Sequence, residues 1–322
     1  MADFIERLKS GVLVADGAMG TMLQQAGLLP GSAPEEWNIS HPKVIEGVHT
    51  AYIQAGAGLI LTNTFGGNSI KLKKSGLEGK TAEVNIQAAC IAKKAAAGAV
   101  DFSGNKVYVA GDIGPSGEFM EPLGALKRDD LIDAFSRQAE YLAEGGVDLF
   151  IIETMTDIEE LVCAVEAVNK VSQLPVIASM SFEPAGDKYR TMMGVGPQVM
   201  WDRLVSMDCR IMGANCGLIP DQMKEVIRDL KSCRQKDSAK IKKDTAAVQQ
   251  DAAEGGRKFF FIAQPNAGHP KLVDGKTVFE QTPNEFAHQA SQLVAAGADI
   301  IGGCCGTTPS HIEKLCEAIK TL

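Results

Sequence analysis

One pattern recurs along the chain: a helix-like segment ends at glycine, a short apolar run follows, and a polar or glycine-rich loop comes next. Three clear copies occupy residues 54–63, 144–153 and 296–304. A unit repeated in this way indicates a fold built from similar strand–helix steps. The pattern therefore favours an α/β fold with a parallel sheet.

Apolar runs mark eight candidate strands, which we place at 12–15, 59–61, 107–110, 149–152, 176–180, 211–214, 259–263 and 300–302. Helices are expected between and after them, at 42–55, 82–97, 129–143, 158–171, 198–206, 221–230, 284–296 and 309–320. Strands that alternate with helices in this way predict a closed (β/α)8 TIM barrel. An open doubly wound sheet is the alternative, but no G-x-G-x-x-G sequence opens the first helix.

The length agrees with one barrel, because such a barrel takes about 250 residues plus insertions and this chain has 322. We therefore assign 1–322 to a single domain. The stretch at about 231–258 interrupts the pattern, since it is rich in Lys, Asp, Gln and Ala and shows no apolar face. We interpret it as a solvated insertion, partly helical or disordered, with Cys233 exposed in it.

Charge and hydropathy limit the partners and the location. The formal net charge of −8 at pH 7 argues against nucleic acid or an anionic membrane as the main partner. No apolar run approaches the ~18 residues of a membrane span. The N-terminal residues also lack the apolar core of a signal peptide. We expect a cytoplasmic protein with reduced thiols and no membrane contact.

Two adjacent cysteines, Cys304 and Cys305, follow the last predicted strand and are flanked by glycines. Neighbouring side chains on a strand point to opposite faces, but glycines let the backbone turn so that both sulfurs face one point. A vicinal disulfide is one interpretation, and zinc bound by thiolates is the one we favour. Cys216 follows the sixth predicted strand, at the same end of the barrel, and is the expected third ligand.

Three protein ligands leave one zinc position open, which is typical of a catalytic site. Three thiolates give the centre a net charge of about −1, which suits it to hold a further thiolate rather than to drive hydrolysis. A free thiol with pKa ~8.5 is only slightly ionised at pH 7, so metal binding would activate it. We therefore expect Cys216, Cys304 and Cys305 to serve the alkylation of a substrate thiol. Without substrate, Asn266 is the expected fourth ligand, with water as the alternative.

Polar residues at the ends of other strands predict how the rest of the substrate is bound. Asp16 and Glu153 end the first and fourth strands, and two carboxylates at a barrel mouth would bind an ammonium group. Helix capping or an internal ion pair is the alternative role for both. Backbone N–H groups that could hold a carboxylate lie in the turn formed by Gly17, Ala18, Met19 and Gly20. A substrate with all three groups is an amino-acid thiol.

Five motifs carry a resemblance to a known family: DGAMGT at 16–21, TNTF at 62–65, GANC at 213–216, PNAG at 265–268 and GGCCGTTP at 302–309. Together they resemble the zinc-dependent homocysteine S-methyltransferases over nearly the whole chain. Within that family, the fourth and fifth motifs are most similar to the homocysteine-binding domain of cobalamin-dependent methionine synthase.

The resemblance implies a barrel with zinc on Cys216, Cys304 and Cys305 and with homocysteine as the methyl acceptor. It places Asp16 and Glu153 near the amino group of homocysteine. Thr62 and Asn63 belong to one of the shared motifs, so the resemblance also implies that they lie in the substrate site.

The resemblance further implies a methyl-corrinoid, a cobalamin cofactor, as the methyl donor. The sequence ends at Leu322, just after the eighth predicted helix, so we expect the corrinoid to be supplied in trans, by a separate corrinoid protein. Only two Trp and four Tyr are available to cage a quaternary ammonium donor such as betaine. Methylation of another thiol and use of S-methylmethionine or betaine-type donors stay open as alternatives. So does a non-catalytic barrel that is stabilised by zinc and binds a thiol.

Overall fold

Eight parallel strands form one sheet whose two edges meet. The structure, a computed structural model, describes residues 2–241, 259–273 and 276–322. The strand order is β1-β12-β9-β8-β5-β4-β3-β2, and a parallel bridge between Ala15 and Leu59 joins the ends. The strands are β1 (Leu13–Val14), β2 (Leu59–Leu61), β3 (Tyr108–Ile113), β4 (Leu149–Met155), β5 (Val176–Met180), β8 (Ile211–Asn215), β9 (Phe260–Gln264) and β12 (Ile300–Ile301). The predicted (β/α)8 TIM barrel is confirmed.

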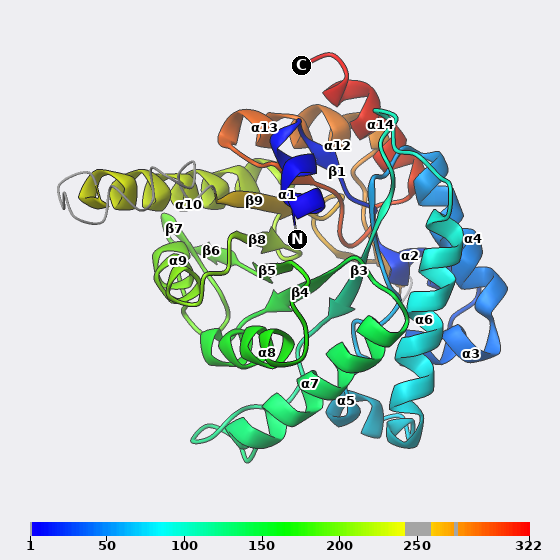
Figure 1. The fold of residues 1–322 in the computed structure, drawn as a ribbon. Helices are drawn as coiled ribbons and strands as arrows, with labels where there is room; N and C mark the ends of the chain where they lie inside the picture. Colours follow the sequence, from blue (N-terminus) through cyan, green and yellow to red (C-terminus); the bar gives the residue numbers. More distant parts are fainter. Residues whose placement is uncertain (1, 242–258, 274–275) are drawn as a thin grey trace.

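Helices surround the strands as the apolar pattern predicts (Figure 1). Those that follow the barrel strands are α4 (Pro42–Gln54), α6 (Thr81–Ala96), α7 (Arg128–Glu144), α8 (Ile158–Val171), α9 (Pro197–Ser206), α10 (Pro220–Ile241), α12 (Pro283–Ala290), α13 (Gln292–Ala296) and α14 (Pro309–Ile319). The predicted helix at 284–296 is interrupted at Ser291, whose hydroxyl donates to the His288 carbonyl at 3.0 Å. Within the described residues, no helix has the length and apolar composition to cross a bilayer.

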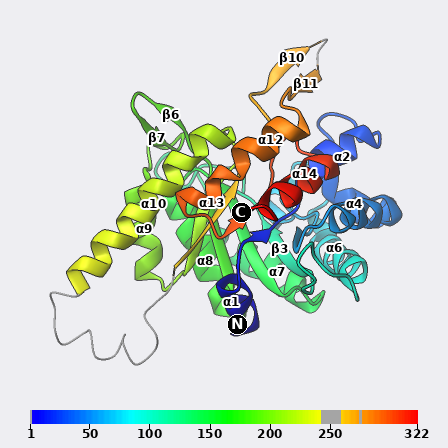
Figure 2. The same ribbon diagram turned by 90° about the horizontal axis from the view of Figure 1, so that it is seen from above.

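Short elements decorate both ends of the barrel, and the sequence did not predict them. They are α1 (Ala2–Lys9), α2 (Met19–Gln25), η1 (Pro34–Glu36), α3 (Trp37–Ser40), α5 (Ser69–Lys73), η2 (Glu78–Lys80) and the hairpins β6 (Glu183–Ala185) with β7 (Lys188–Arg190) and β10 (Lys271–Val273) with β11 (Lys276–Val278). Figure 2 shows both hairpins at one end of the molecule and α1 at the other. Segments of three to eight residues carry too few positions for a periodic pattern to stand out.

The inside of the barrel is an apolar core of its own, separate from the core between strands and helices. Alternate residues point inward: Tyr108 and Ala110 on β3, and Leu149 and Ile151 on β4, all belong to the inner core. Helix α1 closes the amino-terminal end of the barrel, where Phe4 packs edge-on against Tyr108 with ring centroids 5.0 Å apart. The opposite end, where the strands finish, is therefore the end that is free to hold a site.

The boundary that we predicted for the insertion is wrong, because α10 continues through Ile241. Cys233 was expected to be exposed, but it is 4% exposed and packs in the outer core on the same helix face as Leu230. Arg234 donates to the Phe259 carbonyl at 3.0 Å, which ties this part of the helix to the start of β9. Leu230 and Cys233 form a narrow apolar face on this helix. It could not be recognised in the sequence because lysines and glutamines surround it. Residues 242–258 of the predicted insertion lie outside the described residues.

His49 gives the fold a testable dependence on pH. The side chain is fully buried on α4, and burial lowers its pKa from 6.5 to about 4. The folded protein favours the neutral ring of His49. The contribution of this ring to the free energy of unfolding is therefore fully present above pH 6.5 and is lost as the pH falls toward 4, by up to about 3 kcal/mol. We expect His49→Leu to lose less stability than the parent protein between pH 7 and pH 4.5 in urea unfolding. The exposed His288→Leu is the control, and equal pH dependence in all three proteins would contradict the prediction.

Candidate active site

Three cysteines meet where β8 and β12 end. The sulfurs of Cys216, Cys304 and Cys305 all lie within 4.8 Å of one another, and those of Cys216 and Cys305 are 3.9 Å apart. Cys216 adopts a left-handed backbone, with φ +58°, and its N–H donates to the Gln264 carbonyl at 3.0 Å. The Cys304 N–H donates to the Pro265 carbonyl at 2.8 Å. These backbone bonds fix both cysteine loops to the end of β9.

The donor set fits a zinc ion. Zn–S bonds of about 2.3 Å in tetrahedral geometry separate the sulfurs by roughly 3.8 Å, close to the spacing of Cys216 and Cys305. All three cysteines are free thiols, so the vicinal disulfide that we considered is not formed. Hydrogen bonds from Cys304 and Cys305 lower the pKa of the Cys216 thiol to about 3. Among the described residues, this is the one group of three or more Cys, His, Asp or Glu side chains spaced to hold a metal.

A cavity of about 860 Å³ opens over the cysteines at the same end of the barrel. Its walls come from the last residues of β3, β4 and β9 and from the segments that follow β1, β2, β8, β9 and β12. Every residue that we predicted for substrate binding lines it: Asp16, Gly17, Ala18, Met19, Gly20, Thr62, Asn63 and Glu153. The barrel thus gathers, around one space, residues that are up to about 290 positions apart in the sequence.

The buried carboxylate of Asp16 and the half-buried carboxylate of Glu153 have no ion-pair partner among the described residues. Asp16 accepts the Leu61 N–H at 2.9 Å, and burial followed by the charge of Glu153 raises its pKa well above 3.8. Burial, then the charge of Cys216, raises the pKa of Glu153 to about 8. Two ionised carboxylates that are largely withdrawn from water in one cavity are costly unless a cation joins them. An ammonium group of a ligand would supply it.

Comparison with known proteins identifies the family. The sequence pattern that defines the homocysteine S-methyltransferases matches residues 13–319. The chain belongs to this family. It is therefore a methyltransferase, and the resemblance seen in the five sequence motifs is confirmed.

Solved structures support the fold assignment. The metallated form of the homocysteine methyltransferase MmuM from Escherichia coli superposes with a TM-score of 0.72 at 21% identity, over 95% of this chain and 96% of MmuM. The oxidised form of MmuM gives a TM-score of 0.71 at 22% identity, over 94% of each chain. The carboxyl transferase domain of Rhizobium etli pyruvate carboxylase gives 0.50 at 14% identity, over 99% of this chain and 49% of that one. At these identities the likeness shows the fold alone.

The turn at residues 17–20 of this methyltransferase uses one of its predicted carboxylate-binding N–H groups within the protein. Helix α2 begins at Met19, and the Ala18 N–H is donated to the Thr307 hydroxyl at 3.0 Å. Gly17 is required there, because an added Cβ would lie 2.6 Å from the same hydroxyl oxygen. One of the predicted backbone donors is thus used within the protein. Whether the others bind a carboxylate stays a prediction.

Thr62 and Asn63 line the cavity, but their polar atoms also hold the surrounding loops. The Thr62 hydroxyl shares a hydrogen bond with that of Thr64 at 2.6 Å and accepts the Asp112 N–H at 2.9 Å. Asn63 donates to the Pro34 carbonyl at 2.8 Å and to the Asn38 side chain at 3.0 Å. Direct contact of either residue with substrate stays a prediction.

Asn266 lies next to the cysteine cluster, and hydrogen bonding to its side chain contributes to the lowered pKa of Cys216. Its Oδ1 is buried and has no hydrogen-bond partner among the described residues. An oxygen in this state is compatible with a metal ligand. The cavity walls, however, include Gln264 and not Asn266. The role of Asn266 as fourth ligand stays a prediction.

Asn215 is a site residue that the sequence analysis missed. Its Oδ1 accepts the Thr154 N–H at 2.8 Å, and its Nδ2 donates to the Thr154 hydroxyl at 2.6 Å and to Glu153 at 3.2 Å. The register of β4 shifts here, and Thr154 adopts a left-handed φ of +59°. Asn215 thereby fixes the bulge that turns Glu153 into the cavity. Its position directly before Cys216 was the available signal.

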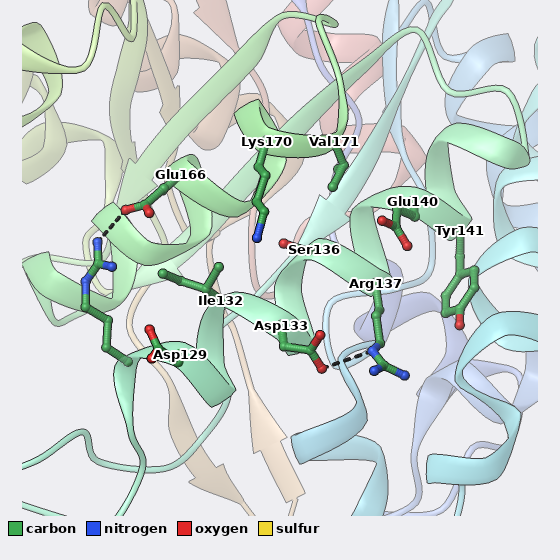
Figure 3. A pocket seen from close by; sticks show the side chains of 11 residues that line it. Asp129, Ile132, Asp133, Ser136, Arg137, Glu140, Tyr141, Glu166, Lys170 and Val171 are labelled. Atoms are coloured by element: carbon green, nitrogen blue, oxygen red, sulfur yellow. Dashed lines mark hydrogen bonds and ion pairs between the residues drawn. The ribbon is translucent and has the colours of Figure 1, made fainter.

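A second hollow, of about 540 Å³, lies on the outer surface of this methyltransferase between α7 and α8 (Figure 3). Four of its charged side chains form two ion pairs: Arg128 with Glu166, and Arg137 with Asp133 at 3.0 Å. It contains none of the cysteines and none of the buried carboxylates. We therefore place the active site in the cavity at the strand ends.

Proposed function

We propose that this enzyme transfers a methyl group to the thiol of homocysteine, forming methionine, with zinc held by Cys216, Cys304 and Cys305. The observation that carries the proposal is the convergence of three sulfurs and two unpaired carboxylates, Asp16 and Glu153, on one cavity. These groups match the thiol and the ammonium of an amino-acid thiol. Membership of the homocysteine S-methyltransferase family supports the same acceptor.

The residues of the chain divide the work of the reaction. Zinc, when bound, would keep the substrate sulfur ionised and nucleophilic. Asp16 and Glu153 hold the ammonium end and so fix the direction of the thiol. The sulfur then attacks the methyl carbon: a new S–C bond forms, the bond to the donor breaks, and its electron pair leaves with the donor. Asn215 keeps Glu153 in place through the β4 bulge.

The methyl donor is, in our proposal, a methyl-corrinoid carried by a separate corrinoid protein. A cavity of about 860 Å³ is too small to enclose a corrinoid together with homocysteine, so the donor would approach from outside. Most of the exposed large apolar side chains in the described chain lie in the segments that follow the carboxyl ends of β1, β3, β5 and β9, which favours a protein partner at this end of the barrel. They are Leu29, Phe119, Leu123, Met192, Leu272, Val273 and Val278.

A small sulfonium donor such as S-methylmethionine is the second candidate, and the charge of the cavity favours it. The carboxylates of Asp16, Glu35, Asp112 and Glu153 line the cavity against the ammonium groups of Lys71 and Lys74. Burial raises the pKa of Asp16, Asp112 and Glu153, and a cationic donor would favour their ionised forms and so bind well beside them. Betaine is less suitable, because the described residues of the cavity wall include Phe65 and Phe279 but no Trp or Tyr to form an aromatic cage.

A side-by-side assay tests the proposal. Zinc-loaded protein and L-homocysteine would be mixed with free methylcobalamin, a methylated corrinoid protein, S-methylmethionine or betaine, and methionine would be measured by mass spectrometry. We expect methionine from methylcobalamin, faster formation from the corrinoid protein, and little from betaine. Faster turnover with S-methylmethionine than with any methyl-corrinoid would overturn the proposed donor only. No methionine from any donor, together with unfolding when a chelator removes zinc, would indicate a structural zinc site instead.

A further inference from the structure

A third buried carboxylate, Asp112, faces the cavity and has no role in the function described so far. It lies near the end of β3, two residues after Ala110 of the inner core, and therefore points into the barrel. In the sheet register Asp112 is opposite Ile151, two residues before Glu153. The side chains of Asp112 and Glu153 thus project from adjacent strands into the same space.

The main chain around Asp112 is held rigidly. Its N–H donates to the Thr62 hydroxyl at 2.9 Å. Its carbonyl accepts the Thr64 hydroxyl at 2.7 Å and the Gln138 side chain at 3.3 Å. None of these bonds involves the carboxylate, so the end of β3 positions the side chain without providing it with a hydrogen-bond donor.

One oxygen of the Asp112 carboxylate has no donor in the described part of the chain. Asp112 is 5% exposed, and its Oδ1 is buried without a hydrogen-bond partner among the described residues. Asp16 and Glu153, by contrast, each accept an N–H from the protein. Burial, followed by the charges of Glu153 and Asp16, raises the pKa of Asp112 well above 3.8. Lys71 has a smaller effect on this pKa, and its ammonium group lies over the Phe65 ring, 4.4 Å from the centroid.

A buried acceptor without a donor lowers the stability of the folded protein. When such a group faces a cavity, a bound ligand can supply the missing donor. Gln264, on β9, has a second orphaned acceptor, Oε1, on the same cavity wall. The ligand that this end of the cavity accepts should therefore be rich in N–H donors. An α-ammonium group has three donors and no acceptor, which is one donor for each of the three carboxylates.

We propose that Asp112 is the third carboxylate of the ammonium subsite and binds the amino group of homocysteine together with Asp16 and Glu153. The inference rests on the proposed function, since it takes homocysteine as the acceptor. The charges of Glu153 and Asp16 both act to raise the pKa of Asp112, because like charges in one cavity repel each other. The bound ammonium removes this repulsion and draws the oxygens toward it.

The test compares two ligands that differ only in the amino group: L-homocysteine and 4-mercaptobutanoic acid. Their dissociation constants would be measured by isothermal titration calorimetry with zinc-loaded parent protein and with Asp112→Asn. Losing a charged acceptor should weaken homocysteine binding about 10- to 100-fold. Binding of 4-mercaptobutanoic acid should change less than about 3-fold. The preference of the protein for homocysteine therefore falls, a change that a merely structural role would not produce.

Glu35→Gln is the matched control. Glu35 also lines the cavity as a buried carboxylate, but its Oε1 accepts the Gly66 N–H at 2.6 Å, and an amide oxygen retains that bond. This variant should keep the preference of the parent protein. Asp112→Asn removes a like charge, so it should unfold at the same or a higher temperature than the parent; if it does not fold, Asp112→Ser is used in its place.

The outcomes separate the two proposals. If the parent protein binds homocysteine tightly and Asp112→Asn keeps the same preference over 4-mercaptobutanoic acid, the role of Asp112 is overturned while the proposed function stands. If Glu35→Gln loses the preference equally, the effect is a general one of cavity charge, and the role of Asp112 is again overturned. If the parent protein binds neither thiol, the proposed function itself fails.

Discussion

Replacing Cys304 by serine is expected to remove zinc from the protein and to lower methyl transfer to homocysteine by about 1000-fold or more. Serine is a hard oxygen donor that does not ionise near neutral pH, so it replaces a thiolate poorly. The fold should persist, because Cys304 lies in a loop after β12 and outside both apolar cores. Zinc content after dialysis, by mass spectrometry, and methionine formation measure the two effects.

Cys90→Ser is the control for this experiment. Cys90 is an exposed thiol on α6, far from the strand ends, so its loss should leave zinc content and turnover unchanged. Retention of one zinc per chain by Cys304→Ser, with turnover like that of the parent, would show that the cysteine cluster does not hold the catalytic metal.

Replacing Gly213 by alanine is expected to cost more than about 4 kcal/mol of stability and to yield little folded protein. An added Cβ would lie 1.9 Å from the carbonyl oxygen of Ile262 on the neighbouring β9. Backbone atoms cannot move aside as a flexible side chain can, so β8 and β9 would have to separate. Cys216 comes directly after β8, so a shift of this strand would also move the Cys216 sulfur. Any variant protein that folds should therefore bind zinc weakly. Urea unfolding and the yield of soluble protein measure the effect.

Gly47→Ala is the matched control for Gly213→Ala. Gly47 lies on the exposed side of α4 and has no atom within 4 Å of the added Cβ. Alanine is favoured over glycine in a helix, so stability should be unchanged or rise by up to about 1 kcal/mol. A Gly213→Ala protein as stable as the parent would mean that the strands are less tightly paired than described.

The strands and the site residues at their carboxyl ends could be predicted because each apolar run in the sequence is followed directly by polar residues. β2 and β5 begin and end where the apolar runs predict, since buried parallel strands are continuously apolar. Cys216, Cys304 and Cys305 could be brought together from sequence because each directly follows a strand, and the carboxyl ends of barrel strands share one face. The predicted substrate residues line the cavity for the same reason.

The parts that were missed depend on packing across the barrel. Asp112 comes after the strand that we predicted at 107–110, so the sequence did not mark it as a strand residue. Its side chain is recognised as pointing into the barrel only from the register of β3 with β4. Helix α1 was not predicted, and nothing in the sequence indicates that Phe4 packs against Tyr108 at the amino-terminal end of the barrel. Cys233 was wrongly predicted to be exposed, because the apolar face of α10 is reduced there to single residues among polar ones.

The position of β12 between β1 and β9 has a consequence for the order of events during synthesis. The ribosome makes Cys216 first, and Cys305 emerges 89 residues later. Domains fold progressively as the chain emerges, but this sheet cannot close before its last strand is available. A nascent chain thus carries one isolated thiol ligand and gains the other two only with the strand that completes the ring. At the proposed zinc site, metal capture would therefore follow closure of the ring, and a partially made chain would lack the complete set of three thiol ligands.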